Sequence, residues 1–135
     1  MQKQKIQQMA LVMATALLLP VGTSAEAEAP HKPVEIILTA EQIAAQNPKQ
    51  YAKDQFTKFN WSDEQMSCLG KLWGKESAWN HLADNPHSTA FGIAQMLGED
   101  SLLVSVQIDR GLRYIEHRYG KPCVAWQFWQ RNKWY

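Results

Sequence analysis

The chain has 135 residues, with 14 Lys and Arg against 13 Asp and Glu and a formal net charge of +1. This length suffices for one domain with a single hydrophobic core. The near balance of charge leaves no basic stripe of the kind that binds nucleic acid, so we expect no nucleic-acid partner.

The N-terminal residues have the pattern of a secretory signal peptide. Lys3 and Lys5 precede an uncharged, mostly apolar run over residues 9–21, and small residues follow at 23–25. The alternative is a membrane anchor, but the run is short for a bilayer. Removal of residues 1–25 takes two lysines and no acids, leaving 14 − 2 = 12 basic against 13 acidic residues. We predict a periplasmic or secreted protein of net charge −1, with no membrane span after cleavage.

Residues 26–38 are rich in Ala, Glu and Pro and show no apolar period, which predicts a flexible leader. Thr39 to Gln42 has the spacing of a helix capping box. Asn47 followed by Pro48 places a cap before a proline at the first helical position. Two short helices therefore open a predicted domain over 39–135.

The clearest helix start is the segment Trp-Ser-Asp-Glu-Gln-Met over 61–66. Ser62 is expected to cap the amide of Gln65, and the Gln65 side chain to reach back in return. The helix is predicted to run to about Trp79. Its apolar stripe consists of Met66, Leu69, Leu72 and Trp73.

Glu76 falls within the same stripe at helical pitch, so a carboxyl group faces the core. Burial and the negative end of the helix dipole both raise the pKa of such a group. A carboxyl that stays protonated near neutrality suits a general acid. The pattern equally allows a structural glutamate bonded to buried backbone groups or to Arg110 or Arg113.

The rest of the chain is also mainly helical. Residues 80–90 are polar and turn-forming, and a small hairpin is possible over 91–96. A helix over 102–119 is expected to stop at Gly120, and Pro122 opens a last one. The predicted fold class is mainly α with a minor β-hairpin.

Three motifs carry a resemblance to a known family. Cys-Leu-x-x-Leu-Trp-x-x-Glu-Ser-x-Trp-Asn spans 68–80, and Ala-x-Asn-Pro-x-Ser-x-Ala-Phe-Gly-Ile-x-Gln spans 83–95. Tyr-Gly-x-Pro-Cys-x-Ala-Trp follows over 119–126, with Trp-Tyr at 134–135. Together they resemble the soluble lytic transglycosylase family, in its small branch with this C-terminal segment. The resemblance covers roughly residue 48 to 135 and implies a small lysozyme-like helical domain.

The resemblance implies that Glu76 is the single catalytic acid and base. It would protonate the glycosidic oxygen of the β-1,4 bond between N-acetylmuramic acid and N-acetylglucosamine. The 6-hydroxyl of the muramic acid would then attack its own anomeric carbon, giving a 1,6-anhydro end. This chemistry needs no second carboxylate, whereas the usual glycosidases need two. Four other acids are interpreted as loop, cap or surface residues: Asp84, Glu99, Asp100 and Asp109.

The substrate-binding residues follow from the same resemblance. Ser77 stands beside the acid, and the Gly-Ile-x-Gln segment lines the cleft, with the glycine expected where the backbone approaches a sugar closely. The predicted set is Ser77, Gly92, Ile93, Gln95, Tyr114, Tyr119 and Trp126. Its three aromatic members are candidates for stacking on sugars, with core packing as the alternative.

Cys68 and Cys123 are the only cysteines. An exported chain would join them, so we predict one disulfide, with two buried free thiols as the alternative. The four histidines show no ligand spacing, and no metal or cofactor is expected.

The expected partner is therefore a peptidoglycan glycan strand, bound by a monomer. Two other functions stay open: a hydrolytic lysozyme-type muramidase, and a catalytically silent cell-wall-binding protein on the same fold.

Overall fold

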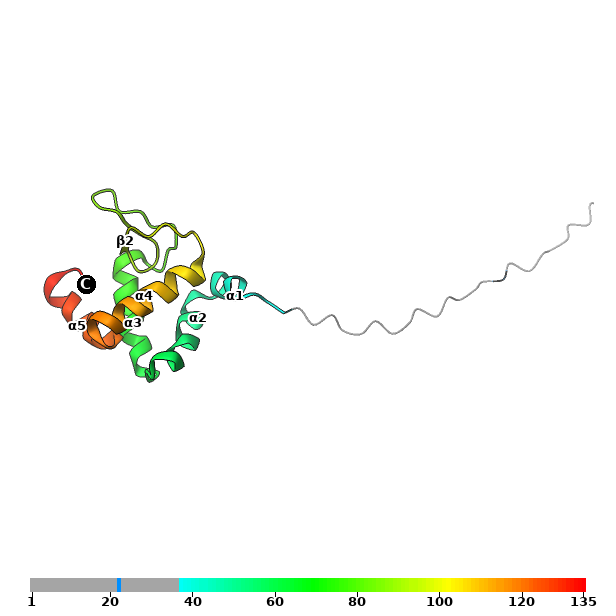
Figure 1. Ribbon diagram of the computed structural model, residues 1–135, viewed down its shortest axis with the longest axis horizontal. Coiled ribbons are helices and arrows are strands. Elements are labelled where there is room, and N and C mark those ends of the chain that lie inside the picture. Colours follow the sequence, from blue (N-terminus) through cyan, green and yellow to red (C-terminus); the bar gives the residue numbers. More distant parts are fainter. Residues whose placement is uncertain (1–21, 23–36) are drawn as a thin grey trace, which may run out of the picture. The chain divides into compact units, whose positions relative to one another are not determined.

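Helices account for most of the fold, which the computed structural model describes over residues 37–135 together with residue 22 (Figure 1). The predicted signal peptide over 1–25 and the leader over 26–38 lie almost entirely outside the described residues. Both remain predictions. No helix among the described residues is long and apolar enough to cross a membrane.

Three α-helices, with a 3-10 helix between the second and the third, precede a hairpin and two further α-helices. They are α1 (Ala40–Gln46), α2 (Pro48–Asp54), the 3-10 helix η1 (Gln55–Phe59), α3 (Glu64–Ser77), β1 (Ala90–Phe91), β2 (Met96–Leu97), α4 (Val104–Tyr119) and α5 (Pro122–Asn132). The two strands pair antiparallel, with Ala90 opposite Leu97. The predicted fold class, mainly α with a minor hairpin, is confirmed.

Both predicted caps at the start of the domain are confirmed. The Thr39 hydroxyl accepts the Gln42 N–H at 3.2 Å, and the Gln42 side chain accepts the Thr39 N–H at 2.8 Å. The Asn47 side chain accepts the Gln50 N–H at 3.1 Å, with Pro48 at the first helical position. These local bonds satisfy amides that a helix N-terminus leaves unpaired.

The predicted cap of α3 is wrong. The helix begins at Glu64, and the Ser62 hydroxyl bonds the Glu64 carboxylate at 3.2 Å instead of an amide. The side chain of Gln65 accepts the N–H of Cys123 at 2.9 Å, so it serves the start of α5. A local carboxylate therefore takes the Ser62 hydroxyl, and a distant backbone donor takes the Gln65 side chain. The helix ends at Ser77, because the next two residues have positive φ.

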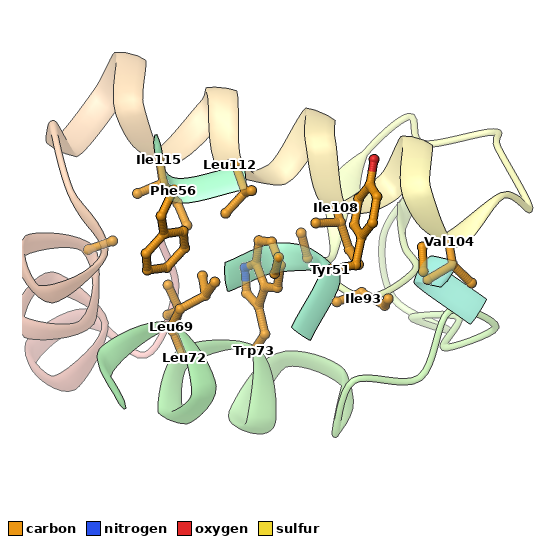
Figure 2. Close-up of a cluster of buried hydrophobic side chains, with 14 residues drawn as sticks. Tyr51, Phe56, Leu69, Leu72, Trp73, Ile93, Val104, Ile108, Leu112 and Ile115 are labelled. Atoms are coloured by element: carbon orange, nitrogen blue, oxygen red, sulfur yellow. The ribbon is translucent and has the colours of Figure 1, made fainter. Parts of the chain in front are cut away.

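The core lies between α3 and α4, whose apolar side chains face each other in Figure 2. Leu72 and Trp73 from α3 meet Ile108 and Leu112 from α4, and all four are fully buried. Gly111 makes room on α4 for the Trp73 ring. A Cβ there would lie 2.7 Å from the Trp73 ring and from the Ala94 methyl group. The core thus fixes α3, which ends at Glu76 and Ser77.

The predicted disulfide between Cys68 and Cys123 is confirmed, with 4.9 Å between the two Cα atoms. It joins the first half of α3 to the start of α5. Because α5 packs closely on α3, the bridge holds the helix that carries Glu76 beside the helix that carries Trp129.

Glu41 in α1 caps the start of α4. Its carboxylate oxygens accept the N–H groups of Val104 and Ser105 at 2.9 and 2.8 Å. Burial alone would raise the pKa of Glu41, but the bonds from Ser105 and Val104 outweigh it and the pKa is lowered. An ionised carboxylate is favoured at a helix N-terminus because the dipole is positive there.

We expect Glu41→Ala to lower the free energy of unfolding by about 1 kcal/mol at neutral pH, as for loss of a helix cap. The pKa of Glu41 is lower in the folded protein than in the unfolded chain, where it is near 4.5. The cap therefore stabilises the fold above pH 4.5, and this stabilisation is lost as the pH falls through the pKa of the folded state. The difference from wild type in urea unfolding should therefore shrink in acid. Glu41→Gln keeps one acceptor oxygen and should lose less; equal stability of wild type and Glu41→Ala would contradict the cap.

Candidate active site

Glu76 lies in the last turn of α3, one turn beyond Leu72 and Trp73, and is half-buried. Its carboxyl group lines a hollow of about 290 Å³ between the end of α3, the hairpin region and the segment after α5. The other polar and aromatic residues of this hollow are Asn85, Ser88, Gln95, Lys133, Trp134 and Tyr135. The hollow therefore offers one acid, hydrogen-bonding groups and ring faces.

The hydrogen-bond partner of Glu76 is an indole. Trp129 in α5 donates its Nε1–H to Glu76 Oε1 at 2.5 Å. Neither Arg110 nor Arg113 bonds Glu76 among the described residues, and Arg110 pairs with Glu99 and Asp100 instead. Burial raises the pKa of Glu76 and the bond from Trp129 partly opposes this, so the net pKa is raised. A neutral donor thus orients the carboxyl without fixing it in the charged form.

Trp129 was not among the predicted site residues, since the sequence favours core packing for a tryptophan in the terminal helix. Its ring stacks on Trp126, with centroids 5.3 Å apart and an interplanar angle of 13°. The ammonium group of Lys133 lies 5.2 Å from the Trp129 centroid. Trp126, predicted as a sugar-stacking candidate, therefore backs the tryptophan that holds the acid and does not line the hollow.

We expect Trp129→Phe to raise the pKa of Glu76 further, because the lost indole bond is the contribution that lowers it. Carbon NMR of the Glu76 carboxyl, titrated in wild type and variant, measures this shift. Trp126→Phe is the matched control, since it changes the stacked ring and keeps the indole donor. An unchanged or lower pKa in Trp129→Phe would contradict the assigned role.

Ser77 and Ile93 join the end of α3 to the hairpin region. The Ser77 hydroxyl donates to the carbonyl oxygen of Ile93 at 2.6 Å. Ile93 is fully buried, and its N–H donates to the side-chain oxygen of Gln107 at 3.0 Å. Neither Ser77 nor Ile93 lines the hollow. They hold the loop in place beside Glu76.

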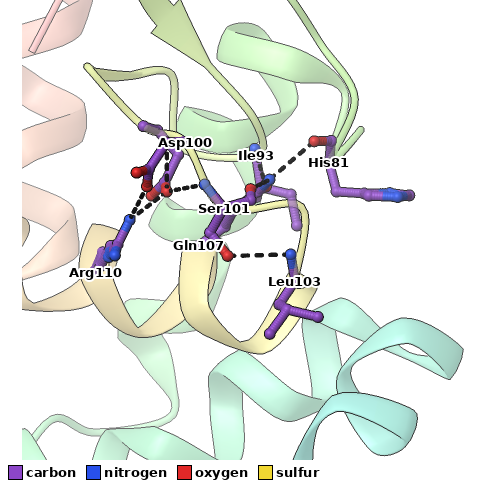
Figure 3. A network of polar contacts seen from close by, with 8 residues as sticks. His81, Ile93, Asp100, Ser101, Leu103, Gln107 and Arg110 are labelled. Atoms are coloured by element: carbon purple, nitrogen blue, oxygen red, sulfur yellow. Dashed lines mark hydrogen bonds and ion pairs between the residues drawn. The ribbon is translucent and has the colours of Figure 1, made fainter.

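Gly92 has φ +77°, and a Cβ there would collide with the side-chain amide of Gln107. The contact with Gln107 is enough to explain why residue 92 is a glycine, and no close approach of a sugar is needed to explain it. Gln107 is 1% exposed and donates to the carbonyl oxygens of His81 and Ser101 at 2.9 and 2.7 Å (Figure 3). One buried amide thus fixes three loop segments around the site.

Gln107, whose side chain holds the loops around the site, was not predicted from the sequence. It follows Val104 by three residues and precedes Ile108, so a polar residue stands in the apolar stripe of α4. Buried amides in such stripes are hydrogen-bonded, and this position could have signalled the network.

Gln95 lines the Glu76 hollow and has φ 49°. Its side-chain nitrogen donates to the carbonyl oxygens of Ala83 and Gly92 at 3.0 and 2.9 Å. Its side-chain oxygen has no hydrogen bond to the described part of the chain. Of the predicted Gly-Ile-x-Gln contacts, Gln95 is the one whose side chain reaches the hollow, where the oxygen is free to accept from a hydroxyl or an acetamido N–H.

The aromatic residues at the C-terminal side of the site have different roles. Tyr135 accepts the indole N–H of Trp73 and donates to the carbonyl oxygen of Ala94, both at 2.8 Å. Burial raises the pKa of Tyr135 well above its usual range, so the hydroxyl stays protonated. Tyr119 packs on Tyr114 with a centroid distance of 6.3 Å, and its buried hydroxyl has no partner within 37–135. Tyr119 therefore belongs to the packing around the site.

Tyr114 lines a second hollow, of about 300 Å³. This hollow shares four residues with the Glu76 hollow: Gln95, Leu97, Trp134 and Tyr135. The two are neighbouring parts of one surface depression. Of the three predicted stacking residues, Tyr114 is the one that reaches it.

Among the residues described, Glu76 is the only Asp or Glu whose side chain lines the Glu76 hollow. Glu99 and Asp100 bond Arg110, Asp109 accepts from the Tyr51 hydroxyl at 3.3 Å, and Asp84 is exposed. No group of three or more His, Cys, Asp or Glu that could hold a metal occurs within the described residues. A larger hollow of about 450 Å³ beside α2 and α3 is lined by three lysines and no acid.

Comparison of the chain with protein-family models, with curated proteins and with solved structures finds no match. The function is therefore argued from the chemistry of the site. A half-buried carboxyl with a raised pKa, in an open hollow lined by amides and aromatic rings, is equipped to give a proton to a polar, ring-containing substrate.

Proposed function

We propose that this protein is a peptidoglycan lytic transglycosylase, with Glu76 as its single general acid and base. The observation that carries the proposal is the solitary acidic side chain: Glu76 is half-buried, has a raised pKa, and shares its hollow with no second Asp or Glu side chain of the described residues. Export to the periplasm or beyond, and binding of a glycan strand by a monomer, belong to the same proposal.

In the proposed reaction, protonated Glu76 gives its proton to the oxygen that links N-acetylmuramic acid to N-acetylglucosamine. The bond from that oxygen to the anomeric carbon breaks, and the N-acetylglucosamine leaves with a free hydroxyl. The Glu76 carboxylate then takes the proton of the muramic 6-hydroxyl as its oxygen bonds the anomeric carbon. Glu76 ends protonated, and no water is consumed.

The solitary acid favours this route over two-carboxylate hydrolysis. Retaining and inverting glycosidases place two carboxyl groups about 5 to 9.5 Å apart across the scissile bond. The other described acids near the hairpin are engaged with Arg110 or exposed. A substrate that supplies its own nucleophile removes the need for a second carboxyl.

The polar groups of the hollow support a sugar substrate. Asn85, Ser88 and Gln95 bring amide and hydroxyl groups, while Trp134 and Tyr135 bring ring faces. Sugars present alternating hydroxyl edges and apolar faces, so this mixture of groups suits them.

Digestion of purified sacculi, followed by mass spectrometry of the fragments, tests the proposal. We expect muramic acid ends in the 1,6-anhydro form. Reducing muramic ends would support the hydrolytic muramidase instead. Binding to sacculi without release of any fragment would support the silent wall-binding protein.

A further inference from the structure

Arg118, in the last turn of α4, lies among four aromatic rings. Its guanidinium carbon is 5.0 Å from the centroid of Trp134, 5.5 Å from Tyr119, 5.8 Å from Tyr114 and 5.9 Å from Phe128. One of its nitrogens also donates to the Tyr114 hydroxyl at 2.5 Å. These contacts hold the planar group in one place, which lowers the entropy it loses on binding a ligand.

The part of the chain that the structure describes gives Arg118 no acidic partner. Among the described residues, no Asp or Glu oxygen lies within 4.0 Å of Arg118. Arg110, two turns earlier on the same helix, pairs with both Glu99 and Asp100. Arg118 is also exposed, so its free N–H donors can be reached from solvent.

Arg118 lines the second hollow, which adjoins the Glu76 hollow through Gln95, Leu97, Trp134 and Tyr135. Met96 and the exposed Leu97 add apolar side chains to the lining of the same hollow. A ligand that extends from the acid across Gln95 would therefore meet an unpaired cation in a hollow that also has apolar side chains.

We propose that this second hollow is a subsite that binds a carboxylate carried by the muramic acid unit beside the scissile bond, with Arg118 as the binding residue. The inference rests on the proposed function. A guanidinium takes a carboxylate through two parallel hydrogen bonds. The apolar side chains fit the methyl group of a lactyl or D-alanyl unit. Arg118 thus selects strands whose muramic substituent bears a negative charge.

Two sources can supply this carboxylate: the peptide stem, or the lactyl group once the stem has been removed. Three soluble strand preparations separate them: strands with native stems, strands with their stem carboxylates amidated, and strands without stems. A fourth preparation, without stems and with the lactyl group amidated, completes the set. Binding is measured by titration calorimetry with Glu76→Gln protein, so that no strand is cut.

In the Glu76→Gln protein, adding Arg118→Gln is expected to weaken binding by about tenfold or more for the strand preparation whose carboxylate Arg118 binds, either native stems or free lactyl groups. Amidation of that preparation should abolish the difference between the two proteins. Arg113→Gln is the matched control, because Arg113 is an exposed arginine of the same helix outside both hollows. Arg118→Lys should restore part of the affinity, and thermal unfolding checks that each variant is folded.

An equal loss with carboxylate-bearing and amidated strands would overturn the subsite, because Arg118 would then act only by packing on the rings. No loss with any preparation would overturn it as well. Cleavage of the same strands by protein that retains Glu76 is measured separately. Cleavage with no carboxylate preference refutes the subsite alone, whereas absence of cleavage refutes the proposed function.

Discussion

Glu76→Gln is expected to reduce cleavage of peptidoglycan by about 10²- to 10⁴-fold, the usual contribution of a general acid. Glutamine keeps the shape and the acceptor oxygen that meets the Trp129 N–H, but it has no proton to give at neutral pH. Release of soluble fragments from sacculi measures the rate. Glu64→Gln, in the exposed first turn of the same helix, is the matched control and should cleave normally.

The same substitution is expected to raise Tm at neutral pH. The pKa of Glu76 is higher in the folded protein than in the unfolded chain, where it is near 4.5. Its protonated carboxyl therefore stabilises the fold below pH 4.5, and this stabilisation is lost as the pH rises through the pKa of the folded state. A neutral glutamine avoids this loss, and the gain in Tm should vanish in acid.

A Glu76→Gln protein that is folded and still cleaves at the wild-type rate would contradict the role of Glu76.

Loss of the disulfide is expected to produce the largest change in stability. The bridge joins residues that are 55 apart in the chain. Closing a loop of this length stabilises the fold by about 4 kcal/mol on the chain-entropy model. The double variant Cys68→Ser, Cys123→Ser should lose about this much in urea unfolding, a large part of the stability of so small a domain.

The bridge should also affect cleavage, because α5 carries Trp129 and α3 carries Glu76. Activity of the double variant is therefore expected to fall at temperatures well below its unfolding midpoint. Wild-type protein treated with reductant and alkylated is the control for the two serines. Unfolding free energies within about 0.5 kcal/mol of wild type, the scale of a neutral surface substitution, would contradict a stabilising role.

Local signals predicted the helices well. Thr39 and Asn47 cap short helices through bonds that span three residues, and both caps form as the pattern predicts. The stripe through Leu69 and Leu72 is buried because helical period and burial coincide there. Such features depend on neighbours in the sequence.

The failures involve distant partners. The reciprocal half of the cap at Ser62 fails because the Gln65 side chain accepts the N–H of Cys123, while the Ser62 hydroxyl bonds the nearby Glu64. The indole of Trp129 reaches Glu76 across 53 residues, which no local pattern encodes. Gly92 was predicted to let the backbone approach a sugar, whereas the close neighbour that the fold gives it is the side chain of Gln107.

The position of the acid followed from periodicity, whereas its surroundings did not. The stripe places Glu76 toward the core and gives the direction of its pKa shift. The stacking residues depended on tertiary packing: Tyr114 lines a hollow, Tyr119 is packed among other rings, and Trp126 lies behind Trp129. Arg118 carried no signal in the sequence, because only the fold gathers four rings around it.

Cleavage of sacculi in water enriched in oxygen-18 tests most directly whether a solitary acid works here without a water nucleophile. The heavy oxygen would enter the muramic acid end only if water attacks the anomeric carbon. We expect muramic ends that carry no label and are lighter than reducing ends by the mass of one water. Incorporation of one labelled oxygen for each bond cut would contradict the account.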